Sequence, residues 1–142
     1  MIYHRSILAD LLTPVSAFIR IADGVDRAFL LESVEGGEKV GRYSFIGIDP
    51  ERTFKGNFAK FRRSFPESQK PQPGFPPFTG GAVGICCYDM VRELEQLPSL
   101  NRVKGGISPS TSVLMDFYST VVAFDHIKHE IIINACGKIY KF

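Results

Sequence analysis

Two strand-like runs on either side of a glycine pair constrain the fold of this chain more than any other feature. The runs span residues 29–34 and 43–48, and Gly36-Gly37 supplies a turn between them. Short apolar runs of this kind are typical of β-strands, and a glycine turn joins two strands into a hairpin. We therefore expect an antiparallel strand pair, closed by Asp49-Pro50 because a residue before proline favours extended geometry.

Side chains of an extended run alternate between its two faces. Phe29, Leu31 and Ser33 then share one face, while Leu30 and Glu32 share the other. Ser33 is expected to point toward the interior, where an unpaired hydroxyl costs roughly 1–3 kcal/mol. We expect a bound ligand or a buried backbone group beside it. The plainer alternative is a polar strand end that enters a solvated turn.

The rest of the chain predicts one α+β domain over residues 1–142, with a mostly antiparallel, strongly twisted sheet and two or three helices. Helical spacing of apolar residues after Thr13-Pro14 predicts a helix that ends at Asp23-Gly24. We expect two more helices at 57–65 and 89–97, further strands at 53–56, 80–88, 113–124 and 130–134, and loops at 66–77 and 100–109. The small apolar residues of 80–88 indicate a buried central strand.

Composition and charge exclude several classes of function. The chain has 142 residues, of which 44% are hydrophobic and 23% charged, so an independent core is feasible. Its net charge of +2 and one short basic cluster, Lys60-Phe-Arg-Arg63, argue against nucleic-acid binding. No apolar run reaches the ~20 residues of a membrane span, and the first residues lack the apolar core of a signal peptide. We expect a soluble, cytoplasmic protein without a membrane partner.

Motifs that suggest chemistry have simpler explanations. Residues 79–84, Thr-Gly-Gly-Ala-Val-Gly, lack the Lys-Ser/Thr ending of a phosphate-binding loop, so we expect glycines that allow close backbone approach. His126 and His129 offer only Asp125 as a third metal ligand. The three cysteines, two of them adjacent at Cys86 and Cys87, give neither an even disulfide set nor a metal spacing, and we expect small buried residues there. Because no catalytic constellation can be assembled, the chain alone is expected to be inactive.

Five blocks of sequence resemble the amino-terminal domain of anthranilate synthase component I, a chorismate-utilising enzyme. In chain order they are Leu-Thr-Pro-Val-Ser at 12–16, the stretch from 29 to 47, Phe-Thr-Gly-Gly-Ala-Val-Gly at 78–84, Tyr-Asp-Met-Val-Arg at 88–92, and Val-Val-Ala-Phe-Asp-His-Ile-Lys-His at 121–129. The resemblance covers nearly the whole chain. It implies one layer of that family's sandwich fold and a role in tryptophan biosynthesis.

The resemblance also implies an effector site. In the family, the Leu-Leu-Glu-Ser block lines an allosteric pocket for tryptophan, the end product of the pathway. Carried over, this implies effector contacts from Leu31, Glu32 and Ser33, with Tyr43 and Ser44 of the Arg-Tyr-Ser block nearby.

The family's catalytic and magnesium-binding residues lie in a carboxy-terminal portion that is absent here. The resemblance therefore implies no cofactor in this chain and magnesium in the complete enzyme. It implies two protein partners, the catalytic carboxy-terminal domain and a glutamine amidotransferase component II that delivers ammonia.

Alternatives to this assignment stay open. The related aminodeoxychorismate synthase component shares the fold, although the intact blocks at 31–33 and 41–44 favour the anthranilate enzyme. A stand-alone amino-acid sensor or a truncated, non-functional remnant is a different class. A middle shorter than the family's, an unfamiliar ending from Cys136 to Phe142, and Ile85-Cys-Cys87 in place of the family's aromatic and glycine residues motivate it.

Overall fold

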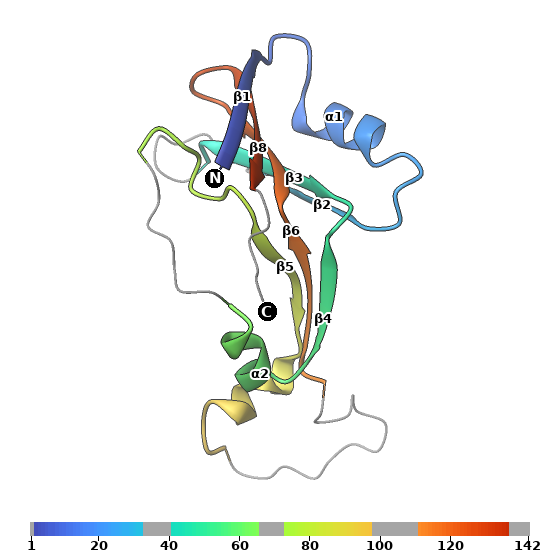
Figure 1. The fold of residues 1–142 in the computed structure, drawn as a ribbon, viewed down its shortest axis with the longest axis vertical. Helices are drawn as coiled ribbons and strands as arrows, with labels where there is room; N and C mark the ends of the chain where they lie inside the picture. The colour runs from blue at the N-terminus through green and yellow to red at the C-terminus, as the bar shows by residue number, and fades with distance from the viewer. Residues whose placement is uncertain (1, 33–40, 66–72, 98–110, 137–142) are drawn as a thin grey trace.

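A computed structural model describes residues 2–32, 41–65, 73–97 and 111–136, and in this part of the chain all strand pairs are antiparallel (Figure 1). A five-stranded sheet, sheet A, has the order β1-β8-β7-β3-β2, and a three-stranded sheet, sheet B, has the order β4-β6-β5. The strands are β1 (Ile2–Leu8), β2 (Ala28–Leu31), β3 (Tyr43–Ile48), β4 (Arg52–Gly56), β5 (Gly81–Cys86), β6 (Val113–Tyr118), β7 (Thr120–Asp125) and β8 (Glu130–Cys136). The helices are α1 (Pro14–Ile21), α2 (Phe58–Arg63) and the 3-10 helix η1 (Tyr88–Glu93). The predicted α+β class is confirmed, with two sheets instead of one.

Helix α1 begins as the sequence predicts. Thr13 caps it, because its hydroxyl accepts a hydrogen bond from the backbone N–H of Ser16 at 3.1 Å. The Ser16 hydroxyl in turn accepts from the Thr13 N–H at 3.0 Å, and Pro14 fills the first helical position. The helix packs on sheet A through Ala17 and Phe18, beside strands β2 and β3.

The expected hairpin is present as β2 and β3, whose register pairs Phe29 with Gly47 and Leu31 with Phe45. Strand β3 has the predicted bounds, while β2 ends at Leu31. A Cβ atom on Gly47 would lie 2.2 Å from the ring of Phe29, so the absence of a side chain at residue 47 leaves the space that this ring occupies on the sheet. The predictions for Ser33, Gly36-Gly37, the loop at 100–109, part of the loop at 66–77 and the ending after Cys136 lie outside the described residues.

Two core clusters stabilise the two sheets. The cluster of sheet A and α1 is centred on Ala17, Ile46, Phe124 and Ile131. The cluster of sheet B and α2 is centred on Phe61, Val113 and Phe117, with Phe54, Phe58 and Met90 packed against it. The predicted helix at 57–65 is therefore confirmed as α2, which Asn57 caps by accepting from the N–H of Lys60 at 2.9 Å.

The predicted strand at 113–124 is wrong as a single element. It bends at Ser119, so that β6 lies at the centre of sheet B and β7 lies inside sheet A. Strand β7 pairs with β8 around the expected turn at 125–129. Strand β1, which the sequence reading missed, pairs with β8 and forms an edge of sheet A.

The prediction of a buried central strand at 80–88 is also wrong. Strand β5 is an edge of sheet B, and Gly84, Ile85 and Cys86 are exposed. Small apolar residues do mark a close backbone approach here, because a Cβ on Gly84 would lie 2.1 Å from the carbonyl oxygen of Leu114. The expectation of buried cysteines at these positions is also wrong, since Cys86 is exposed and Cys87 is half-buried.

The helix predicted at 89–97 is a short 3-10 helix instead. η1 ends at Glu93, whose carboxylate accepts from the N–H of Phe58 at 2.9 Å and from the hydroxyl of Ser112. These bonds hold Glu93 against the first turn of α2. Asp89 and Arg92 form the expected surface ion pair at 3.2 Å. No helix in the described part of the chain is long and apolar enough to cross a membrane.

Candidate functional site

The two faces of sheet A differ in what covers them. Alternation along β3 and its register with β2 and β7 place Ser44 and Ile46 on the face that α1 covers. Phe29, Leu31, Tyr43 and Phe45 lie on the opposite face, which we call the aromatic face. Both faces carry residues that the sequence assigned to one effector site.

On the aromatic face, the rings form a chain of contacts. Phe45 lies 5.6 Å from the ring of Phe78, edge to face, and Phe29 contacts both Phe78 at 6.3 Å and Tyr118 at 4.8 Å. Tyr43 stacks beside Phe45 at 5.9 Å. Such pairs stabilise an apolar platform beyond their burial alone. Phe78, which comes from the segment before β5, is a member that sequence reasoning did not single out as a site residue.

The structure brings two of the predicted effector residues onto this face. Leu31 ends β2 with 49% of its surface exposed, next to its register partner Phe45. Tyr43 is half-buried beside the same ring. Glu32 follows the strand and is exposed, and Ser33 lies outside the described residues. The edge of the aromatic face at the end of β2 therefore presents an exposed Leu followed by an exposed carboxylate.

Ser44 lies on the other face. It is fully buried, and its hydroxyl lies 2.8 Å from Nε2 of His126 in the turn after β7. The predicted contact of Ser44 with an effector stays a prediction.

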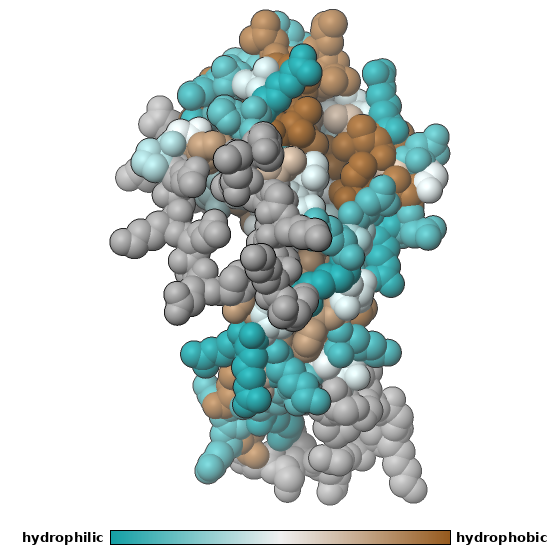
Figure 2. Space-filling view, in the orientation of Figure 1, coloured by the Kyte–Doolittle hydropathy of each residue, from teal (hydrophilic) through white to brown (hydrophobic). Residues whose placement is uncertain are grey.

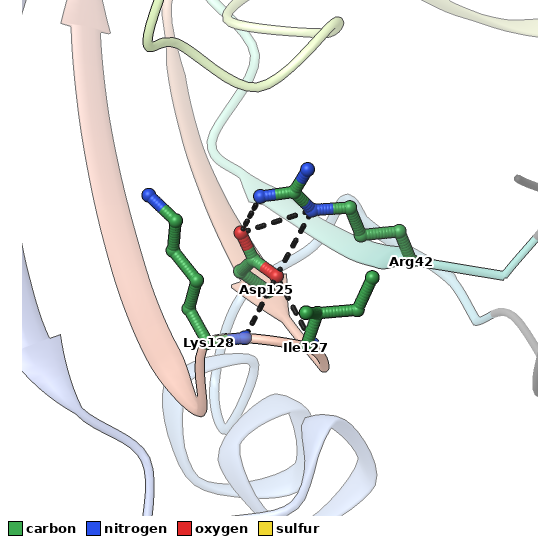
Figure 3. Close-up of polar contacts among 4 residues, drawn as sticks. All are labelled: Arg42, Asp125, Ile127 and Lys128. Carbon is green, nitrogen blue, oxygen red and sulfur yellow. Dashed lines mark hydrogen bonds and ion pairs between the residues drawn. The ribbon is translucent and has the colours of Figure 1, made fainter. Parts of the chain in front are cut away.

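Asp125 is the register partner of Tyr43, and its buried carboxylate ties the start of β3 to the turn between β7 and β8 (Figure 3). Asp125 accepts from Arg42 through Nη2 at 2.6 Å and through Nε at 3.1 and 3.2 Å. Its Oδ1 also accepts the backbone N–H groups of Ile127 and Lys128, each at 3.1 Å. The Arg42 guanidinium lies 4.9 Å from the centre of the Tyr43 ring. An Asp at the end of a strand is the sequence signal for such a turn, and its pairing with Arg42 is a long-range contact that spacing does not reveal.

These contacts set the ionisation of the group. Burial alone would raise the pKa of the Asp125 carboxyl, but the hydrogen bonds from Arg42, Lys128 and Ile127 and the Arg42 charge outweigh it, so this pKa is lowered. Burial, and then the Asp125 charge, raise the pKa of the Tyr43 hydroxyl. The charges of Arg42 and Asp125 therefore compensate each other beside Tyr43, at one end of the aromatic face.

The turn histidines do not form a metal site in the described residues, which contain no group of three or more His, Cys, Asp or Glu side chains placed to hold an ion. His126 contacts Ser44, and Asp125 is committed to Arg42 and the turn. His129 adopts a positive φ of 54° that closes the hairpin.

A concave feature lies away from the aromatic face. A shallow groove of about 470 Å³ runs between α2 and η1 and is lined by Phe58, Ala59, Arg62, Arg63, Glu93 and Leu94. Because Glu93 is already bonded to Phe58 and Ser112, the groove presents mainly the two arginines. None of the sequence-predicted site residues lines it.

Known proteins resemble this chain over most of its length. It is 35% identical to anthranilate synthase component 1 of Thermus thermophilus, with 96% of this chain and 32% of the relative covered. It is 34% identical to anthranilate synthase component 1 of Streptomyces coelicolor, with 92% and 25% covered. It is 37% identical to the probable anthranilate synthase component 1 of Schizosaccharomyces pombe, with 83% and 25% covered. The chain thus spans about a third or less of the length of these relatives. No protein-family model matches the chain.

A solved structure confirms the fold. The crystal structure of anthranilate synthase component I from Streptococcus pneumoniae TIGR4 superposes with a TM-score of 0.54 at 21% identity, covering 95% of this chain and 32% of that one. The alignment with the Thermus relative runs over 153 positions, more than the 142 residues of this chain. That relative therefore carries residues that this chain lacks.

Proposed function

Because this chain is related over most of its length to anthranilate synthase component I, we propose that it forms the regulatory part of such an enzyme. The complete enzyme would convert chorismate to anthranilate, a step of tryptophan biosynthesis. The observation that carries this proposal is the 32–38% identity to curated relatives over 65–96% of the chain. A regulatory role fits a chain in which the described residues offer no catalytic constellation.

Tryptophan is the proposed effector, and the aromatic face supports this choice. The exposed side of Leu31 continues the platform of Phe45 and Tyr43, and an indole ring gains most from apolar and aromatic contacts. Glu32, exposed directly after Leu31, offers a carboxylate to the ammonium group of an amino acid. Ser33 would supply a further hydrogen bond.

Chemistry and ammonia supply would come from partners. The described residues do not fit a magnesium ion, because they contain no cluster of candidate ligands. We therefore assign magnesium and chorismate to a catalytic portion beyond this chain, and ammonia delivery to a glutamine amidotransferase component II. The contribution of this chain is to hold the effector and to transmit its binding.

A chimera tests the proposal. This chain would replace the aligned third of the Thermus thermophilus relative, and anthranilate formation from chorismate, magnesium and ammonium would be followed with increasing tryptophan. We expect turnover that tryptophan inhibits. A folded chimera that turns over without inhibition would contradict the regulatory role. A folded but inactive chimera, together with tight tryptophan binding by the isolated chain, would indicate a stand-alone sensor instead.

Within the chimera, Ser33→Ala should weaken inhibition by about 1–2 kcal/mol, roughly tenfold, and leave turnover nearly unchanged. The reason is that the change removes a hydrogen bond to the effector and not to chorismate. By reciprocity, it should also reduce the effect of chorismate on tryptophan binding. Ser6→Ala, an exposed serine on the opposite edge strand of sheet A, is the matched control. An unchanged half-inhibition would leave Ser33 as a plain strand-end residue.

A further inference from the structure

The guanidinium group of Arg42 is only partly used by its ion pair with Asp125. Its Nε and Nη2 atoms donate to the carboxylate at 2.6 to 3.2 Å. Figure 3 shows the third nitrogen, Nη1, pointing away from Asp125, and within the described ranges of the chain it donates no hydrogen bond. The Arg42 side chain is 35% exposed. Because Nη1 carries N–H donors of its own, it can serve a second acceptor.

This free nitrogen lies at one end of the aromatic face. Tyr43 and Asp125 are register partners and therefore share that face, and the Arg42 guanidinium lies 4.9 Å from the centre of the Tyr43 ring. The Tyr43 ring is in turn 5.9 Å from the ring of Phe45, whose register partner is Leu31. Figure 2 shows hydrophobic residues gathered in the upper half of the molecule, where Figure 1 places sheet A. An apolar ring that rests against Leu31 and Phe45 would thus have its polar end beside Tyr43 and Arg42.

The turn at 125–128 fixes the position of Arg42. The Asp125 side chain is 1% exposed, and its Oδ1 also accepts the backbone N–H groups of Ile127 and Lys128. The N–H of His126 donates to the carbonyl oxygen of Arg42 at 2.9 Å. Both the backbone and the side chain of Arg42 are therefore held before a ligand arrives. A donor that is already ordered loses little conformational entropy on binding, and the planar guanidinium matches the geometry of a carboxylate.

The charges around Arg42 favour a zwitterion over a simple anion. Lys128 adds a positive charge to that of Arg42, while Asp125 and the exposed Glu32 supply negative charges. Because these charges balance, a carboxylate alone gains little net attraction. An α-amino acid is also neutral overall, and it can pair its carboxylate with a guanidinium and its ammonium with a carboxylate.

We propose that Arg42 binds the α-carboxylate of the effector through Nη1. This inference rests on the proposed function, since it takes an aromatic amino acid as the ligand of the aromatic face. It divides recognition among three groups: the apolar platform receives the ring, Glu32 receives the ammonium group and Arg42 receives the carboxylate. The site then selects aromatic α-amino acids over aromatic amines. Asp125 is a positioning residue, because it acts on the ligand only through Arg42.

Tryptophan and tryptamine, which lacks only the carboxylate, test this role in the chimera with the Thermus thermophilus relative. Inhibition of anthranilate formation gives the constant for tryptophan, and competition against tryptophan gives the constant for tryptamine. We expect the unsubstituted chimera to prefer tryptophan at least about tenfold. Arg42→Gln should weaken tryptophan roughly tenfold and leave tryptamine unchanged, so that the preference disappears. A general disturbance of β3 would weaken both ligands alike.

Arg42→Lys separates binding from support of the turn. A lysine can keep the ion pair with Asp125, but it has no second arm for another carboxylate, so the preference for tryptophan should again be lost. This variant also serves if Arg42→Gln does not fold. Arg27→Gln is the matched control, because Arg27 is likewise paired with an aspartate, Asp116 at 2.7 Å, and it should change neither constant.

The possible results distinguish this inference from the proposed function. If tryptophan does not inhibit the unsubstituted chimera, both are overturned. If tryptophan inhibits it, but the Arg42 variants keep the preference for tryptophan over tryptamine or weaken both ligands equally, only the role of Arg42 is overturned. A loss of preference in Arg27→Gln as well would also overturn it, since the effect would then not belong to Arg42.

Discussion

Individual buried polar residues in this protein differ in whether the fold provides them with partners. Ser44 lies against His126, and Asp125 accepts bonds from Arg42 and two backbone groups. Asn134 is fully buried in β8, yet its amide oxygen and nitrogen have no hydrogen-bond partner in the described part of the structure. An unpaired buried amide costs free energy, so Asn134 is a weak point of sheet A.

Replacing Asn134 by leucine, which has a similar shape, should stabilise the chain by about 1–2 kcal/mol because the desolvation cost disappears. The measurement is the free energy of unfolding in urea. Asn57→Ala is the control, and it should destabilise by about 1 kcal/mol because Asn57 caps α2. A clear loss of stability in Asn134→Leu would mean that the amide is satisfied by a buried water or ligand.

Asp125 should make the stability of the chain depend on pH. Its pKa is lower in the folded state than in the unfolded chain, so its stabilisation is complete above the unfolded pKa of about 4 and is lost as pH falls through the folded value. Asp125→Asn should therefore cost about 1–3 kcal/mol at pH 7, and the difference from wild type should shrink in acid.

Thermal unfolding between pH 2 and 7 measures this dependence, with Asp116→Asn as the control. Asp116 pairs with Arg27 at 2.7 Å, but the Arg27 side chain is 50% exposed, so that change should cost less than about 1 kcal/mol. A difference between Asp125→Asn and wild type that stays constant with pH would show that Asp125 stabilises the turn without its charge.

Among the elements, strand β5 can pair with β6 only because residue 84 is a glycine. Gly84→Ala should destabilise the chain by about 2–4 kcal/mol, because the new Cβ would meet the backbone of Leu114 at 2.1 Å and β6 would have to shift. Gly47→Ala is the comparison, since there the obstructing atoms belong to the Phe29 ring, which can turn aside. Urea unfolding should rank Gly84→Ala as the more damaging change, and the reverse order would contradict the register of β5 and β6.

The sequence predicted elements whose signals are local and missed those that depend on distant contacts. Thr13-Pro14 marked the start of α1, and the apolar run of β3 had the bounds seen in the structure. The apolar run of β5 looks the same in a central and in an edge strand, so its position in sheet B could not be read. Leu31 and Tyr43 were assigned to a site by resemblance. Phe78 lies on the same face through a contact with Phe45, which is far from it in sequence, so this position could not be predicted.

As a whole molecule, the isolated chain should not form anthranilate from chorismate, magnesium and ammonium. The described residues contain no group of side chains placed to hold a metal ion, and none of their side chains are grouped to act as acid, base and metal ligand together. Product fluorescence above background from the purified chain would contradict this. The active chimera described above serves as the positive control.

The bend at Ser119 has a consequence for how the protein opens. Strands β6 and β7 are one stretch of chain, yet β6 is the middle strand of sheet B and β7 is an inner strand of sheet A. Each of these two strands pairs with two neighbours in its own sheet. If one strand separates from its sheet near Ser119, it displaces the other strand, whose loss would break two ladders in the second sheet. Amide hydrogens in both sheets should therefore exchange through one shared opening event, as expected if the two sheets open as a single foldon.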